Sequence, residues 1–240
     1  IEYAVEEAVL AGIQEIIFIT SHTKPSIENH FSRNYDLEEK LIQRENIDAI
    51  KKINRDIFQD IKFTYVQQES QNGLGDAIFH ARHLIDQEYF AVLLADDLII
   101  NSPSATQQLI TVAEQHNASV LGLNIIPKSD LDKYGVISPL NGEVFGNMCW
   151  VDNIIEKPKK NPPSNMAVFG RYILSHHIFN YLENLNPGFG GEIQLTDAIK
   201  MMLKDYPVAG YLYDGKKFDC GSREGYVQAI QSLASEMLHV

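Results

Sequence analysis

Short apolar segments of strand length alternate with helical patterns along most of this chain, and few folds accommodate such an order. Glu15–Thr20 (EIIFIT), for example, is β-branched and apolar without polar alternation, which is typical of a strand buried on both faces. This alternation favours an α/β fold, with a mostly parallel mixed sheet flanked by helices. The predicted strands are 15–20, 62–67, 89–95, 119–126 and 167–173, and the predicted helices are 37–52, 74–83, 105–116, 194–203 and 223–237.

The section from residue 127 to 163 departs from this rhythm. Its turn dipeptides and short extended runs predict a small antiparallel β insertion or lid. A chain of 240 residues can form one large domain or two small ones. Because strand pattern resumes directly after the polar loop Lys159–Asn165, we interpret residues 1–240 as one domain containing that insertion. The chain opens at Ile1 inside a helical pattern, which we interpret as a truncated N-terminus.

Charge balance and cysteine content exclude several classes of function. The 20 Lys and Arg residues against 32 Asp and Glu residues give a formal net charge of −12. Affinity for nucleic acids and anionic membranes is built from clustered cations, so neither is an expected partner. No apolar run approaches the ~20 residues of a membrane span. Cys149 and Cys220 form no C-x-x-C pattern, which argues against a disulfide scaffold and fits a reducing cytoplasm.

Two adjacent carboxylates, Asp96 and Asp97, follow the most apolar predicted strand. The carboxyl ends of strands open into the ligand crevice of an α/β sheet, and carboxylate oxygens suit a hard cation. We therefore predict Mg²⁺ with a substrate phosphate at this turn. The alternative is that these carboxylates only cap or solvate the turn after the strand.

The segment Gln67–Ala77 joins a strand end to a helix start through a polar loop that contains Gly73 and Gly75. Glycines there let a ligand approach the backbone, and a helix N-terminus offers unpaired N–H donors. A planar heterocycle or a phosphate could bind at this point. The two glycines have no third partner for a G-x-G-x-x-G fingerprint, and a tight strand-to-helix turn is the alternative.

A third candidate is Glu156-Lys157-Pro158, at the end of a short predicted strand. Neighbouring side chains on a strand face opposite ways, so we do not expect Glu156 and Lys157 to pair with each other. One could accept hydrogen bonds from sugar hydroxyls while the other meets a phosphate. The alternative is a solvated run of charge that continues through Lys159 and Lys160.

Two glycine-containing turns precede the last predicted helices. Gly190–Asp197 places carboxylates near a helix start, where they interact favourably with the helix dipole. Phe218–Ser222 contains Asp219, which could be a helix cap or a second metal ligand.

Taken together, these segments resemble one family, the bacterial UTP–glucose-1-phosphate uridylyltransferases, also called UDP-glucose pyrophosphorylases. The matching stretches occur in the family's order over nearly the whole chain, and the ordered set is far more specific than any one of them. They are SIENHF (26–31), GLGDA (73–77), YGV (134–136), EKP (156–158), GRY (170–172), GEIQLTDAI (191–199), DCG (219–221) and GY (225–226).

For the nucleotide, the resemblance implies that Gln68 and Gly73 contact the uracil. Asp96 would hold Mg²⁺ together with the nucleotide phosphates, and Asp219 would support the same ion. Asp96 is accordingly one of two residues to which the resemblance assigns a catalytic role.

Lys157 is the other such residue, and it would meet the sugar phosphate. Gly135, Glu156 and Gly170 would contact the glucose, with Glu192 nearby. The implied reaction is in-line attack by a glucose 1-phosphate oxygen on the α-phosphorus of UTP, which gives UDP-glucose and pyrophosphate.

The resemblance also implies a Rossmann-like nucleotidyltransferase that is cytoplasmic and a homo-oligomer, either a dimer or a tetramer. The family's glycine-rich loop, with its G-x-G-T-R core, would lie before the segment that matches Ile1. Three alternatives stay open: an enzyme that makes a dTDP- or ADP-sugar, a metal-dependent glycosyltransferase, and a catalytically incomplete sugar-nucleotide-binding fragment.

Overall fold

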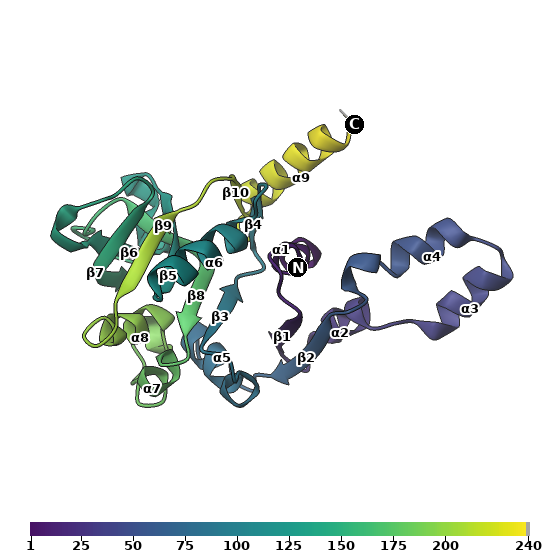
Figure 1. Cartoon of the computed structure of the whole chain (residues 1–240), viewed down its shortest axis with the longest axis horizontal. Coiled ribbons are helices and arrows are strands. Elements are labelled where there is room, and N and C mark those ends of the chain that lie inside the picture. Colours follow the sequence, from purple (N-terminus) through teal and green to yellow (C-terminus); the bar gives the residue numbers. More distant parts are fainter. Residues whose placement is uncertain (239–240) are drawn as a thin grey trace.

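The computed structural model describes residues 1–238, in which strands form a central layer with helices around it (Figure 1). The strands are β1 (Glu15–Thr20), β2 (Lys62–Gln67), β3 (Tyr89–Leu93), β4 (Asp97–Ile100), β5 (Ser119–Ile125), β6 (Gly135–Pro139), β7 (Met148–Glu156), β8 (Met166–Ser175), β9 (Val208–Leu212) and β10 (Lys216–Asp219). The helices are α1 (Glu2–Leu10), α2 (Pro25–Phe31), α3 (Tyr35–Gln43), α4 (Ile47–Ile53), α5 (Leu74–His80), α6 (Ala105–His116), α7 (Ile178–Leu182), α8 (Leu195–Met202) and α9 (Arg223–Leu238). The α/β class predicted from the sequence is confirmed.

The largest sheet has six strands in the order β3-β8-β5-β9-β7-β6, and a further pairing between β6 and β8 curls it toward closure. β1 and β2 form a separate parallel pair, and β4 with β10 forms an antiparallel ribbon. Among the strand pairings of residues 1–238, only β1–β2 and β5–β9 are parallel. The expectation of a mostly parallel sheet is therefore corrected.

The physical reason lies in β8, which is buried along almost its whole length and runs antiparallel to each strand with which it pairs, β3, β5 and β6. A strand covered on both faces is apolar throughout, whatever its direction. A continuous run of hydrophobic residues thus indicates that a strand is buried, but not whether it runs parallel or antiparallel to its neighbours. The antiparallel β6 and β7 from the 127–163 section are joined to this same sheet through β9 and β8.

Helices cover both faces of the six-stranded sheet. On one face, Ile78 of α5, Ile178 of α7 and Ile199 of α8 pack into the core with Leu123 and Leu174 of the sheet. On the other face, α6 buries Leu109 and Val112 against β5, β8 and β9. No helix of residues 1–238 has both the length and the apolar content to cross a membrane.

The predicted helix 37–52 is interrupted, and this is a second difference from expectation. Glu45 adopts a left-handed φ of 55°, and the Asn46 side chain accepts a hydrogen bond from the Ala49 N–H at 3.1 Å. The left-handed Glu45 does not continue the first helix, and Asn46, a favoured N-cap residue, begins the second one. The resulting α3–α4 hairpin projects away from the sheet (Figure 1).

Candidate active site

The β4–β10 ribbon places two acidic turns side by side. Asp97 lies opposite Asp219 in the ribbon, and the Cys220 N–H donates to the Asp96 carbonyl at 2.8 Å. A Cβ atom on Gly221 would lie 3.1 Å from Asp219 Oδ1 and 3.3 Å from Asp96 Oδ2. The carboxylates of Asp96 and Asp219 therefore converge on the space beside Gly221, which the absent side chain leaves open.

This donor set fits a magnesium ion. Mg²⁺ is bound in proteins through one or two carboxylates, with water and substrate phosphates as the other ligands. Within the part of the chain that the structure describes, no three metal-binding side chains form a cluster. A cation here would therefore depend on a bound phosphate or on water to complete its coordination.

Asp97, in contrast, points into the protein and is only 8% exposed. Burial raises the pKa of Asp97 to about 7, and the negative charges of Asp96 and Asp219 act in the same direction, while Arg171 opposes them. Its carboxyl group packs against Gly170, which has a left-handed φ of 56°. Gly170, predicted to contact the sugar, thus also makes room for a buried aspartate.

This close approach makes Gly170→Ala a sensitive test of the packing. An added Cβ would lie 2.6 Å from the Asp97 Cβ and 2.7 Å from its carboxyl carbon, at a backbone conformation that already disfavours alanine. We expect a loss of about 3 kcal/mol in the free energy of unfolding, measured by denaturant titration. Gly142→Ala is the control, because φ there is 73° but nothing lies within 4 Å, and it should lose only about 1 kcal/mol. Equal losses would show that the contact with Asp97 is unimportant.

The proposed sugar residues Gly135 and Glu156 are paired across β6 and β7. Thr196, at the start of α8, donates through its hydroxyl to Glu156 Oε2 at 2.9 Å. A Cβ on Gly135 would lie 2.7 Å from Thr196 Cγ2, so a side chain at Gly135 would push these groups apart. The glycine, the glutamate and the threonine therefore form one compact group.

Lys157 lies next to that group, but not as the sequence predicted. β7 ends at Glu156, and Lys157 turns into a left-handed φ of 44° while its N–H donates to the Tyr134 carbonyl at 3.0 Å. Lys157 Nζ consequently lies 3.6 Å from Glu156 Oε1, so the prediction that the two would not pair was wrong. Strand alternation does not apply to a residue that has left the strand. The ammonium group lies 5.8 Å from the centre of the Phe189 ring.

The proposed uracil residues Gln68 and Gly73 flank the loop between β2 and α5. Gln68 Nε2 donates to Asp76 Oδ2 at 2.6 Å. Gly73 has φ 106°, and a Cβ there would lie 2.8 Å from the Glu192 Cβ. The structure thus brings the proposed uracil residue Gly73 against Glu192, which was assigned to the sugar.

Two residues with no role assigned from the sequence connect the Asp96–Asp219 pair, the group around Glu156 and the contact between Gly73 and Glu192. Tyr134 joins the acidic pair to Lys157, because its carbonyl binds the lysine N–H while burial and the nearby Asp219 raise the pKa of its phenol to about 12. Thr196 belongs to the same segment as Glu192 and so joins the Glu156 group to Gly73. Both lie inside the matching stretches YGV and GEIQLTDAI, but only the contacts show what they touch.

The fold and this site together define an α/β protein that gathers carboxylates, a lysine and close-packed glycines around the ends of its strands. The chain belongs to the nucleotidyl transferase family, whose model matches residues 1–236.

Named relatives are more specific. The chain is 44% identical over 229 residues to a UTP–glucose-1-phosphate uridylyltransferase of Staphylococcus haemolyticus, covering 95% of this chain and 78% of the relative. It is 41% identical over 233 residues to the protein of the same name from Pseudomonas aeruginosa, covering 95% and 82%.

Solved structures agree. A UDP-glucose pyrophosphorylase complexed with UDP-glucose matches with a TM-score of 0.87 and 36% identity, over 98% of this chain and 86% of that one. UTP-bound UGPase from Acinetobacter baumannii matches with a TM-score of 0.88 and 36% identity, over 98% and 82%.

Proposed function

We propose that this chain transfers a uridylyl group from UTP to glucose 1-phosphate, which releases pyrophosphate and gives UDP-glucose. One observation carries the proposal. Asp96 and Asp219 converge beside Gly221, and Tyr134 connects them to Lys157 and Glu156. The phenol of Tyr134 lies near Asp219 and its carbonyl accepts from the Lys157 N–H, so a metal-held nucleotide phosphate and a sugar phosphate would bind close together. The relatives named for this reaction support it.

The chemistry requires little beyond alignment and charge stabilisation. A phosphate oxygen of glucose 1-phosphate attacks the α-phosphorus of UTP, and the bond to pyrophosphate breaks opposite it, so no covalent enzyme intermediate forms. Magnesium held by Asp96 and Asp219 would supply positive charge against the nucleotide phosphates. Lys157 neutralises charge on the sugar phosphate, and Glu156, fixed by Thr196, accepts hydrogen bonds from sugar hydroxyls.

In this proposal, Gln68 and Gly73 contact the uracil, while Gly135 and Glu192 complete the sugar side. Gly73 supports the assignment because it immediately precedes α5 and packs against Glu192, so a base bound there would lie next to the sugar side of the site. A Rossmann-like arrangement of the nucleotide half and a cytoplasmic location belong to the same proposal. The acidic composition, with a net charge of −12, is consistent with local neutralisation of phosphates by a metal and a few placed lysines.

Calorimetric titration with UDP-glucose, with and without Mg²⁺, tests this function directly. We expect binding that magnesium strengthens, and much weaker binding of ADP-glucose under the same conditions. Equal affinity for the two sugar nucleotides would refute the uridylyl assignment. Affinity that is indifferent to Mg²⁺ would remove the metal role of Asp96 and Asp219.

We also propose that the chain is a homo-oligomer, a dimer or a tetramer, with the α3–α4 hairpin as a contact surface. Ile42 is 63% exposed and Ile47 62% exposed on this projecting hairpin. Helices this short are marginal alone and gain stability from packing of an apolar face.

Ile42→Glu should therefore lower the molar mass measured by light scattering during size-exclusion chromatography. The reason is that it places a charge in an apolar contact, where both desolvation and repulsion oppose association. Gln43→Glu, exposed on the same helix, adds the same charge without removing an apolar side chain, and should leave the mass unchanged. An unaltered mass for Ile42→Glu would move the interface elsewhere.

A further inference from the structure

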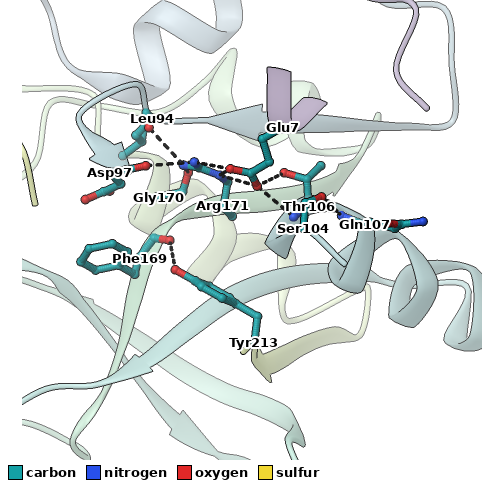
Figure 2. A network of polar contacts seen from close by, with 10 residues as sticks. All are labelled: Glu7, Leu94, Asp97, Ser104, Thr106, Gln107, Phe169, Gly170, Arg171 and Tyr213. Carbon is teal, nitrogen blue, oxygen red and sulfur yellow. Dashed lines mark hydrogen bonds and ion pairs between the residues drawn. The ribbon is translucent and has the colours of Figure 1, made fainter. Parts of the chain in front are cut away.

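Arg171, in the middle of β8, is a buried cation with every donor occupied (Figure 2). It is 1% exposed. Its Nε donates to the Glu7 carboxylate at 3.0 and 3.2 Å, and its Nη2 donates to Glu7 Oε2 at 2.7 Å and to the Asp97 carbonyl at 2.9 Å. Its Nη1 donates to the Leu94 carbonyl at 3.1 Å and the Gly170 carbonyl at 3.0 Å. All five guanidinium hydrogens can thus be satisfied at once.

Glu7 comes from α1, far away in the sequence, and is only 6% exposed. Besides binding Arg171, its Oε1 accepts from the Thr106 hydroxyl at 2.6 Å and from the Thr106 N–H at 3.0 Å. Thr106 lies in the first turn of α6, where the helix dipole favours a carboxylate. Glu7 therefore neutralises the arginine and fixes it relative to two helices.

A buried ion pair is a poor source of net stability, because desolvation of both charges offsets their attraction. The more informative question is what this pair holds in place. Two of the carbonyls that Arg171 binds, those of Leu94 and Asp97, flank the Ala95-Asp96 turn on either side. The guanidinium thus hydrogen-bonds to both ends of the turn that carries the proposed magnesium ligand Asp96.

We propose that Arg171 and Glu7 are positioning residues. They fix the position of the Asp96 turn, so that the Asp96 carboxylate lies beside the Asp219 carboxylate. The inference rests on the proposed function for the identity of the metal site, and it assigns Arg171 and Glu7 a role there. Neither residue needs to touch the substrate. Lysine cannot replace this arginine, because one ammonium has three donors and no planar fork to span three carbonyls and both oxygens of a carboxylate.

The test measures metal affinity without turnover. Wild type, Arg171→Lys and Glu7→Gln are titrated calorimetrically with Mn²⁺ alone, and separately with UDP-glucose in EDTA. We expect Mn²⁺ affinity to fall about tenfold or more in both variants, as is usual when a group that orients a metal ligand is lost. Affinity for UDP-glucose in EDTA should fall much less than affinity for Mn²⁺, because Gly170 is the only proposed sugar or uracil residue that this network touches.

Val112→Ala is the control for instability, since Val112 is buried on α6 but is in the apolar core and not in this network. It should lower the melting temperature and leave Mn²⁺ affinity unchanged. If Arg171→Lys or Glu7→Gln does not fold, Thr106→Val replaces them. It removes the hydroxyl bond to Glu7 while keeping the ion pair, and should weaken Mn²⁺ binding about twofold to threefold.

Folded variants with unchanged Mn²⁺ affinity would overturn the proposal, as would a fall of the same size in Val112→Ala. A wild type that does not bind Mn²⁺ would also overturn it, because there would be no metal ligand to position. Failure of the proposed function is distinguishable, because it appears in the wild type as absent UDP-glucose binding while the Mn²⁺ comparison among variants still holds.

Discussion

Asp96→Asn is expected to reduce magnesium-dependent turnover at least about 100-fold. Asparagine keeps the shape of the side chain and removes the negative charge that would hold a hard cation beside Asp219. In the wild type, two carboxylates face the space beside Gly221, where a Cβ would lie 3.3 Å from Asp96 Oδ2. In the variant only the Asp219 carboxylate remains there. Turnover is measured as formation of UDP-glucose, or as release of UTP from UDP-glucose and pyrophosphate.

Asp152→Asn is the matched control, since Asp152 is exposed on β7 and the change removes the same charge. It should leave turnover and its dependence on Mg²⁺ concentration unchanged. If Asp96→Asn retained most of its activity, the metal would have to be held elsewhere, and Asp97 and Asp219 would be the next residues to replace.

Lys157→Ala should lower turnover by about two to three orders of magnitude. The ammonium is the cation expected to face the sugar phosphate, and charge on that group rearranges as its oxygen attacks phosphorus. The effect should appear mainly in kcat/KM for glucose 1-phosphate and less in binding of UTP. Steady-state kinetics with each substrate varied in turn separates the two.

Lys159→Ala provides a comparison within the same segment. Its ammonium lies 5.7 Å from the Phe189 ring, which the Lys157 ammonium approaches from 5.8 Å, so the two cations share their surroundings. Lys159 lies beyond Pro158 and does not pair with Glu156, and its loss should cost little activity. Equal losses for the two lysines would mean that net charge in this segment matters and the position of Lys157 does not.

Much of the local structure was predictable from the sequence, and the reason is that local patterns encode it. The helix expected at 105–116 is α6, bounded by a Ser104 side chain that caps its N-terminus and by Asn117 in a left-handed conformation at its end. Strand direction was not predictable in the same way. It depends on where distant parts of the chain return to the sheet, as the three antiparallel partners of β8 show.

The candidate site shows the same difference between features that local sequence encodes and features that depend on distant contacts. Motif order pointed to Asp219, the lysine and the glycines, because each lies in a short matching stretch, while Asp96 was found from its position after the most apolar strand. The relation between Glu156 and Lys157 was mistaken because one left-handed residue at a strand end reverses the alternation rule. Arg171 and Glu7 went unnoticed because they are 164 positions apart, and a single sequence carries no sign that they touch.

The left-handed backbone at Lys157 has a consequence for how this protein could change over time. A non-glycine residue at φ 44° costs on the order of 1 kcal/mol, which glycine would recover. Glycine would also remove the ammonium. Selection for heat resistance alone would therefore favour glycine. The role proposed for Lys157 in binding the sugar phosphate requires the lysine, so under that proposal the two pressures oppose each other at this position.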